Sequence, residues 1–188
     1  MSALLFHSRA KTPNARSLSN FYECEVEYDG KKFRSVEHAY TYAKYRHLEG
    51  DALVPDDVLP LLNVRTAQEA KSLGSKKSMT SRGVKLDVGR FDPQRESIMR
   101  QLIGSKVALN PGIQDVLRSL QVGDGPVALY HHSRTDMFWG CHFCQETGTL
   151  KKGLNKLGEL YVEIIGANKR KIESDDEPDP TTKWSRLV

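Results

Sequence analysis

The sequence predicts a mostly helical α+β fold, and three observations support this prediction. Apolar and charged residues alternate between Cys24 and Phe33 around a tight-turn pair, Asp29-Gly30, which indicates a short β-hairpin near the N-terminus. Four segments begin with helix-start signals and continue without helix-breaking residues. Residues 127–130 form a short apolar run with the length of a buried strand.

The first helix is expected directly after the hairpin. Ser35 offers its hydroxyl group as an N-cap, and residues 36–45 contain neither Gly nor Pro. The helical spacing puts Val36, Tyr40 and Ala43 on one stripe. We therefore expect a helix over residues 36–45 that packs on the core through this stripe.

Three further helices have start signals, and a fourth is predicted from spacing alone. The first begins with a capping box at Thr66–Glu69 and ends at Gly74. Asp92-Pro93 precedes the second, over residues 94–109, and Asn110-Pro111 precedes the third, over residues 112–120. The fourth is predicted from the helical spacing of apolar residues from Leu154 to Ile164. No internal repeat is visible, so one domain with one core is expected.

A change in composition marks the end of the expected domain. Residues 167–188 carry a basic triplet, Lys169–Lys171, and then an acidic run with two prolines and almost no apolar residue before Trp184. Such a segment buries too little apolar surface to offset the entropy of ordering. We expect a compact domain over residues 1–166 and a disordered charged tail over residues 167–188.

The composition indicates a reducing, aqueous compartment. Three cysteines do not make the framework of a disulfide-stabilised secreted domain, and no apolar run has the length of a membrane span or a signal peptide core. The protein is expected to be soluble and cytoplasmic, with no membrane partner, and its basic triplet leaves a nuclear location open. The 28 Lys and Arg against 24 Asp and Glu weakly favour anionic partners.

Two polar stretches are candidate chemical sites. Glu37 lies in the first turn of the first helix, where the helix dipole favours a carboxylate, and Lys44 follows two turns later on the same face. The loop Asp136–Gly140 combines a carboxylate, the aromatic face of Trp139 and a glycine that permits close backbone approach. Each has a structural alternative: Glu37 complements the dipole, Lys44 is solvated, Asp136 forms a turn and Trp139 fills the core.

The Cys-x-x-Cys pair at Cys141–Cys144 resembles half of a zinc site, to which His131, His132 or His142 would add a ligand. A second pair at regular spacing is missing, so buried thiols are the favoured interpretation and no metal is expected. Thioredoxin-type chemistry is disfavoured, because that pair opens a helix and this one is expected in a loop.

Six short motifs occur in order over residues 18–162. They are Ser19-Asn20-Phe21-Tyr22, Ser35-Val36-Glu37-His38-Ala39-Tyr40, Lys44, Lys106, Asp136-x-x-Trp139-Gly140 and Gly153-x-Asn155-x-Leu157-Gly158. In this order they resemble the NADAR family, whose name stands for NAD and ADP-ribose associated. Six ordered motifs are far more specific than any one of them.

The resemblance implies a compact YbiA-like fold and an enzyme that cleaves N-glycosidic bonds of ribosides without a cofactor. Members act on ribosylamino-pyrimidine intermediates of riboflavin synthesis or remove ADP-ribose from guanine in nucleic acid. The implied partner is a ribosyl or ADP-ribosyl small molecule, or ADP-ribosylated nucleic acid. By position, the resemblance implies catalytic roles for Glu37, Lys44 and Asp136, and substrate contacts for Asn20, Tyr22, His38, Lys106, Trp139, Gly140 and Asn155.

The sequence departs from the family pattern in three places. Thr41 stands where the first helix usually has Gln, and His131 or His132 stands where a Glu is common. No Trp occurs between residues 75 and 100, where Phe91 is the nearest aromatic residue. The changes at Thr41 and at His131 or His132 leave the identity of the substrate undetermined. The missing Trp would leave fewer aromatic side chains in the wall of the expected pocket.

Cleavage of a C1′–N bond needs a carboxylate for the developing positive charge and a proton donor for the leaving nitrogen. We assign Glu37, kept ionised by the helix dipole, to the anionic role or to water activation, and Asp136 to the ribose hydroxyls or to acid–base work; the two roles are exchangeable. Lys44 offers a covalent route through a Schiff base if burial lowers its pKa. Its alternative role, shared with Lys106, is to pair with substrate phosphates.

Two other functions are weighed beside the enzyme. A non-catalytic module that binds NAD or ADP-ribose follows if the departures at Thr41 and at His131 or His132 have removed a catalytic part. A zinc-stabilised nucleic-acid binder would use Cys141–Cys144 with basic pairs such as Lys31-Lys32.

Overall fold

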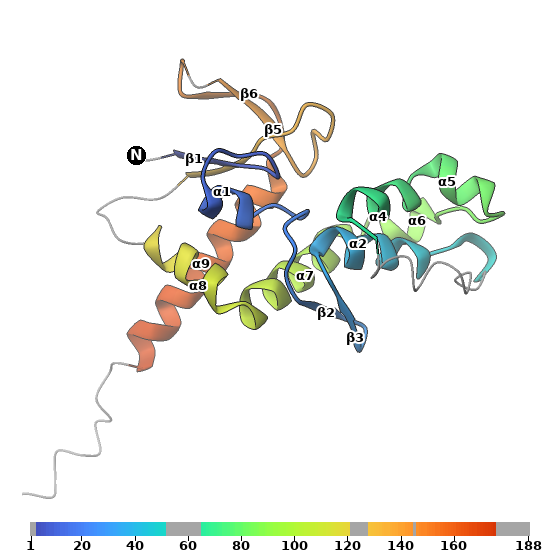
Figure 1. Cartoon of the computed structure of the whole chain (residues 1–188), viewed down its shortest axis with the longest axis horizontal. Coiled ribbons are helices and arrows are strands. Elements are labelled where there is room, and N and C mark those ends of the chain that lie inside the picture. The colour runs from blue at the N-terminus through green and yellow to red at the C-terminus, as the bar shows by residue number, and fades with distance from the viewer. Residues whose placement is uncertain (1–2, 52–64, 121–127, 145, 176–188) are drawn as a thin grey trace, which may run out of the picture.

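A computed structural model describes residues 3–51, 65–120, 128–144 and 146–175 (Figure 1). The helices are α1 (Pro13–Ser17), α2 (Val36–Tyr45), the 3-10 turn η1 (Glu49–Asp51), α4 (Ala67–Leu73), α5 (Lys76–Ser81), α6 (Val88–Phe91), α7 (Arg95–Leu109), α8 (Pro111–Ser119) and α9 (Lys156–Asp175). The strands are β1 (Ala3–Phe6), β2 (Val26–Tyr28), β3 (Lys31–Phe33), β4 (Ala128–His131), β5 (Cys141–Cys144) and β6 (Thr149–Gly153). The fold is α+β with more helix than strand, as the sequence predicts.

The N-terminal hairpin and the helix after it form as expected. Strands β2 and β3 pair antiparallel, and both turn residues are left-handed, with φ of 53° at Asp29 and 67° at Gly30. The Ser35 side chain accepts a hydrogen bond from the His38 amide, which begins α2 at the predicted place.

The later helices agree with their start signals, except at the C-terminal end. The capping box at Thr66 and Glu69 is present, and α7 and α8 lie within one residue of their predicted bounds. Helix α9, however, continues to Asp175, so residues 167–175 are helical and do not belong to a disordered tail. Residues such as Lys and Glu extend a helix by propensity after its apolar stripe ends. The rest of the expected tail, 176–188, lies outside the described residues.

The strands in the described residues form three two-stranded pairs. The predicted strand over residues 127–130 is found as β4, which pairs parallel with β1, while Val127 lies outside the described residues. The expectation that Cys141–Cys144 lies in a loop is wrong, because this segment is β5 and pairs antiparallel with β6. Its alternation of buried and exposed residues is the strand period.

Helix α7 connects the two ends of the molecule (Figure 1). It packs against α2 and β2 on one side and against α8 and α9 on the other. At one end α2 packs on α4, and at the other α9 packs on β4. Met99, Leu102 and Ile103 of α7 are fully buried in this core. Among the described helices, none has the length and apolar character that a membrane span requires.

Candidate active site

A cavity of about 600 Å³ lies where α2 and α4 face the start of α7 and the loop after β4. Five of the residues that the family resemblance implies line it: Asn20, Glu37, Lys44, Asp136 and Trp139. The five come from three chain segments that are far apart in sequence: Asn20, helix α2, and the loop between β4 and β5. A cavity of this volume accommodates a nucleotide-sized ligand.

Glu37 is buried in the cavity wall, with 8% of its surface exposed. Burial raises the pKa of its carboxyl group, and the positive charges of Lys71 and Lys44 oppose this rise. The effect of burial on this pKa is thus larger than that of the surrounding charges. A carboxyl group with a raised pKa suits proton transfer near neutral pH.

Lys44 is not the solvated lysine of its structural alternative. Its ammonium group donates a hydrogen bond to the Gly74 carbonyl at 3.3 Å and lies 5.4 Å from the centre of the Tyr40 ring. Burial lowers the pKa of Lys44, and the carboxylate of Glu37 counteracts this. A depressed pKa is what a lysine needs to act as a nucleophile.

Asp136 both lines the cavity and shapes its own loop. Its Oδ1 accepts hydrogen bonds from the amides of Phe138, at 3.2 Å, and Trp139, at 3.0 Å. Its own amide donates to the Ser133 hydroxyl at 2.9 Å. The turn-forming alternative is thus present in the structure together with a place at the cavity.

Trp139 likewise combines a core position with a cavity position. It is 7% exposed, and its indole N–H donates to the Tyr40 hydroxyl at 3.3 Å. The two rings meet edge to face at 5.9 Å between centroids. Phe91 also packs against Tyr40, with 5.6 Å between ring centroids, and lines the cavity, so the aromatic wall persists without a Trp between residues 75 and 100.

The other five implied contact residues do not line this cavity, contrary to expectation. Tyr22 is 41% exposed elsewhere. The His38 ring lies between the Ser35 hydroxyl and the Arg65 carbonyl, at 2.6 Å from each, and so secures the start of α2. A Cβ atom on Gly140 would approach Ser133 Cβ to 2.6 Å, so this glycine serves close chain packing and not ligand approach.

Asn155 and Lys106 also serve the scaffold. Asn155 has a φ of 54°, accepts the His131 amide at 2.9 Å and donates to the Leu129 carbonyl at 2.8 Å, which ties β4 to the start of α9. The Lys106 ammonium is fully buried and donates to the Ser19 carbonyl at 2.8 Å. The Asn155 carboxamide and the Lys106 ammonium group are thus both hydrogen-bonded to the backbone.

Several cavity residues have no motif that marks them in the sequence. Lys71 on α4 lies at the cavity, and its charge acts on Glu37 more strongly than that of Lys44. The Arg95 guanidinium lies 3.5 Å from the centre of the Phe138 ring, which holds a cation at the cavity mouth. Their helix-start signals were visible, but helix packing decides which face meets the cavity.

The departures from the family pattern differ in their relation to the cavity. Thr41 is fully buried and lies against Gly74, outside the cavity lining. His131 and His132 both line it. Burial lowers the pKa of His131 to about 4, so at neutral pH its imidazole is uncharged.

The cysteine pair does not converge on one point. Cys141 is buried and Cys144 half-buried, three positions apart on a strand, where side chains three residues apart point to opposite faces. Across the described segments, no three His, Cys, Asp or Glu side chains are grouped so that they could hold a metal ion.

Comparison with known proteins identifies both the family and the fold. A sequence model of the NADAR domain matches residues 5–165. The NMR structure of the E. coli protein YbiA is similar with a TM-score of 0.64 and 19% sequence identity, covering 96% of this chain and 92% of that chain. A comparison with curated proteins finds no match. The YbiA-like fold expected from the motifs is confirmed.

Proposed function

The chain belongs to the NADAR domain family, and we propose that it is an N-glycosidase that hydrolyses the C1′–N bond of a phosphorylated or ADP-ribosylated N-riboside. The observation that carries the proposal is the meeting of Glu37, Lys44 and Asp136 in one cavity beside Trp139. These are the groups that such a reaction needs: a carboxyl group for proton transfer, an amine or cation, and an aromatic ring for a base. The family implies the reaction class.

In the direct route, Glu37 takes a proton from the attacking water while the C1′–N bond breaks. The hydroxide oxygen bonds to C1′, and the proton passes to the leaving nitrogen. The raised pKa of Glu37 suits both halves of this transfer. Asp136, whose Oδ1 is engaged by two amides, keeps a fixed orientation and receives the ribose hydroxyl groups.

In the covalent route, the Lys44 amine attacks C1′ and the base leaves with a proton. The ring oxygen then takes a proton as the sugar opens to an imine on the lysine, and water hydrolyses this imine to free the sugar. Burial, which lowers the pKa of Lys44, raises the share of uncharged amine that can attack.

One panel of substrates tests the proposal. Purified protein is incubated with NAD, ADP-ribosylated guanine in DNA and ribosylamino-pyrimidines, and released base is measured by chromatography. We expect release from at least one substrate and none from a Glu37→Gln variant. If no substrate releases base while ADP-ribose binds tightly in calorimetry, the protein is a binding module, the alternative favoured by the two histidines in the cavity wall.

The Lys44 variants separate the two routes. Borohydride added during turnover should trap the sugar on the peptide that contains Lys44, with a matching mass increase, and Lys44→Arg should be inactive. A lysine that only neutralises phosphate should tolerate Arg with partial activity, because the charge is kept. An active Lys44→Arg variant without a trapped adduct would exclude the covalent route.

A further inference from the structure

Three consecutive backbone carbonyl groups, those of residues 18–20, are each held by a different helix. The Tyr161 hydroxyl of α9 donates to the first oxygen at 2.9 Å, and the Lys106 ammonium of α7 donates to the second at 2.8 Å. The Glu37 amide of α2 donates to the third at 3.0 Å. The Ser19 oxygen also accepts the Tyr22 amide at 3.1 Å. The segment lies outside any helix or strand, and donors from three helices fix its backbone.

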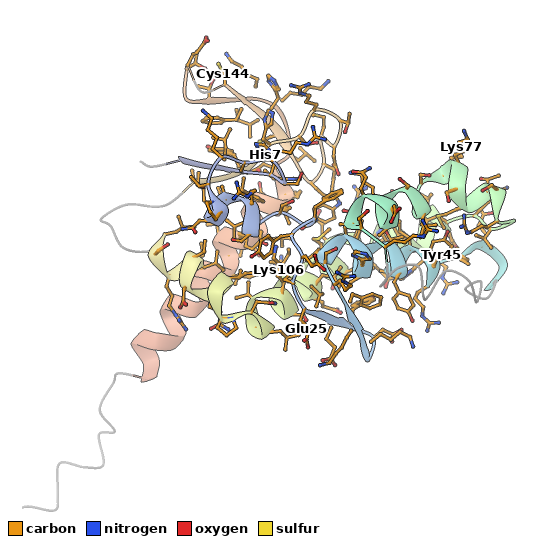
Figure 2. The ribbon with its side chains drawn as sticks, viewed as in Figure 1. His7, Glu25, Tyr45, Lys77, Lys106 and Cys144 are labelled. Atoms are coloured by element: carbon orange, nitrogen blue, oxygen red, sulfur yellow. The ribbon has the colours of Figure 1, made fainter. Side chains whose placement is uncertain are left out.

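Lys106 is an expensive donor for one carbonyl group. It is fully buried near the centre of the molecule (Figure 2), with its ammonium 5.8 Å from the Tyr22 ring centre and 5.9 Å from that of Tyr161. Burial lowers the pKa of Lys106 to about 8, and the nearby side chain of Cys24 opposes this shift. A buried ammonium group costs stability unless it is well paired, so a neutral residue would be expected here if only packing mattered.

Within the described residues, the segment that these donors hold carries a buried polar atom without a hydrogen-bond partner. Asn20 is 7% exposed and lines the cavity, and its Nδ2 donates to Met99 Sδ at 3.6 Å. Within the described residues, the Asn20 Oδ1 is buried and has no hydrogen-bond partner. A buried acceptor without a donor costs stability, which a ligand hydroxyl or N–H group can recover.

We propose that Lys106 is a positioning residue that holds residues 18–20 so that the Asn20 carboxamide oxygen can accept a hydrogen bond from a hydroxyl or N–H group of the substrate. Tyr161 supports the same segment from α9. The Glu37 amide is bound to this segment, so the position of Glu37 depends on it as well. The inference rests on the proposed function, and its first test does not require turnover.

The first test is amide hydrogen exchange of Lys106→Met, which keeps an unbranched apolar stem and removes the donor. Exchange should speed by about tenfold or more in residues 18–22 and in the first turn of α2, and should stay unchanged in α4. Ile103→Val, which removes one buried methyl group from the same helix, is the matched control and should not show this local pattern.

If Lys106→Met does not fold, Tyr161→Phe takes its place, because it removes one hydroxyl group and keeps the ring. The same local increase in exchange is expected. Uniform faster exchange in either variant, equal to that of Ile103→Val, would mean that the clamp only adds general stability and would overturn the proposal.

The second test is a double-mutant cycle on kcat/KM with the substrate found in the panel. Asn20→Ala should raise KM by about tenfold, and Lys106→Met should lower kcat/KM by a similar factor in the wild-type background but by less than about threefold in the Asn20→Ala background. Ile103→Val should combine additively with Asn20→Ala. Additive effects of Lys106→Met and Asn20→Ala would overturn the proposal, whereas absence of all turnover would count against the proposed function and leave the exchange result to decide on the clamp.

Discussion

The cavity wall on α2 and the junction of β4 with α9 are both built from family motifs, but Glu37 and Lys44 of the wall line the cavity and Asn155 of the junction does not. At the junction, the Asn155 carboxamide donates to the Leu129 carbonyl and accepts the His131 amide, so its needs are met within the chain. At the wall, the Lys44 ammonium group donates a hydrogen bond to the Gly74 carbonyl, and burial raises the pKa of Glu37. A shared motif pattern therefore includes residues for chemistry and residues for scaffolding, and a place in the cavity lining distinguishes them.

The largest effect is expected for Glu37→Gln, which should lower kcat by about 10³-fold because the amide cannot carry the proton. The free energy of unfolding at pH 7 should stay the same or rise. The raised pKa means that the folded state holds the proton more tightly than the unfolded state, so ionised Glu37 costs stability as pH rises, and Gln removes this cost. A kcat within tenfold of the wild type would reduce Glu37 to a helix-start residue.

The reverse pattern is expected for Asn155→Ala, with a loss of about 3 kcal/mol in the free energy of unfolding, measured by urea denaturation. The change leaves the Leu129 carbonyl and the His131 amide without their partner, and it puts alanine at a φ of 54°. Asn155→Gly keeps the left-handed backbone conformation without strain. It should therefore recover about 1 kcal/mol of the loss, which is the usual cost of this conformation for alanine. Normal stability together with lost activity would move Asn155 from the scaffold to the site.

We expect protonation of His131 to contribute to the pH dependence of the free energy of unfolding. Its pKa is about 4 in the folded state and near the usual 6.5 when unfolded, so the unfolded state binds the proton more readily. Its contribution is present above pH 6.5 and is lost as pH falls from 6.5 towards 4, by roughly 2 to 3 kcal/mol. The His131→Gln variant should show a flatter slope in this range, and an equal slope in both proteins would contradict the assignment.

The smallest effect is expected for Trp139→Phe, which keeps an aromatic ring and removes the indole N–H bonded to Tyr40. The free energy of unfolding should fall by about 1 kcal/mol, and KM should rise no more than about threefold. Thermal melting and steady-state kinetics measure the two effects. A large rise in KM with unchanged stability would make Trp139 mainly a binding residue.

Local signals predicted much of the fold. The turn pair Asp29-Gly30, the Ser35 N-cap and the Thr66 capping box each act within a few residues, so the chain itself contains all their partners. The β1–β4 pair and the strand character of Cys141–Cys144 depend on partners elsewhere in the chain, and no local pattern indicates these partners. The sequence did not predict the continuation of α9 to Asp175, because the domain boundary at residue 166 was placed by the change in composition and not by helical periodicity.

The sequence by itself determined which chemical groups the protein carries, the hairpin and helices that present them, and the family to which their order belongs. Only the tertiary structure decided which of these groups reach the cavity. Glu37 and Lys44 share one helix face by spacing alone, but their pKa shifts come from burial by α4 and the loop after β4, which local sequence does not encode. Lys106 does not line the cavity and donates a hydrogen bond to the Ser19 carbonyl, because a buried ammonium group binds the acceptor that packing places beside it.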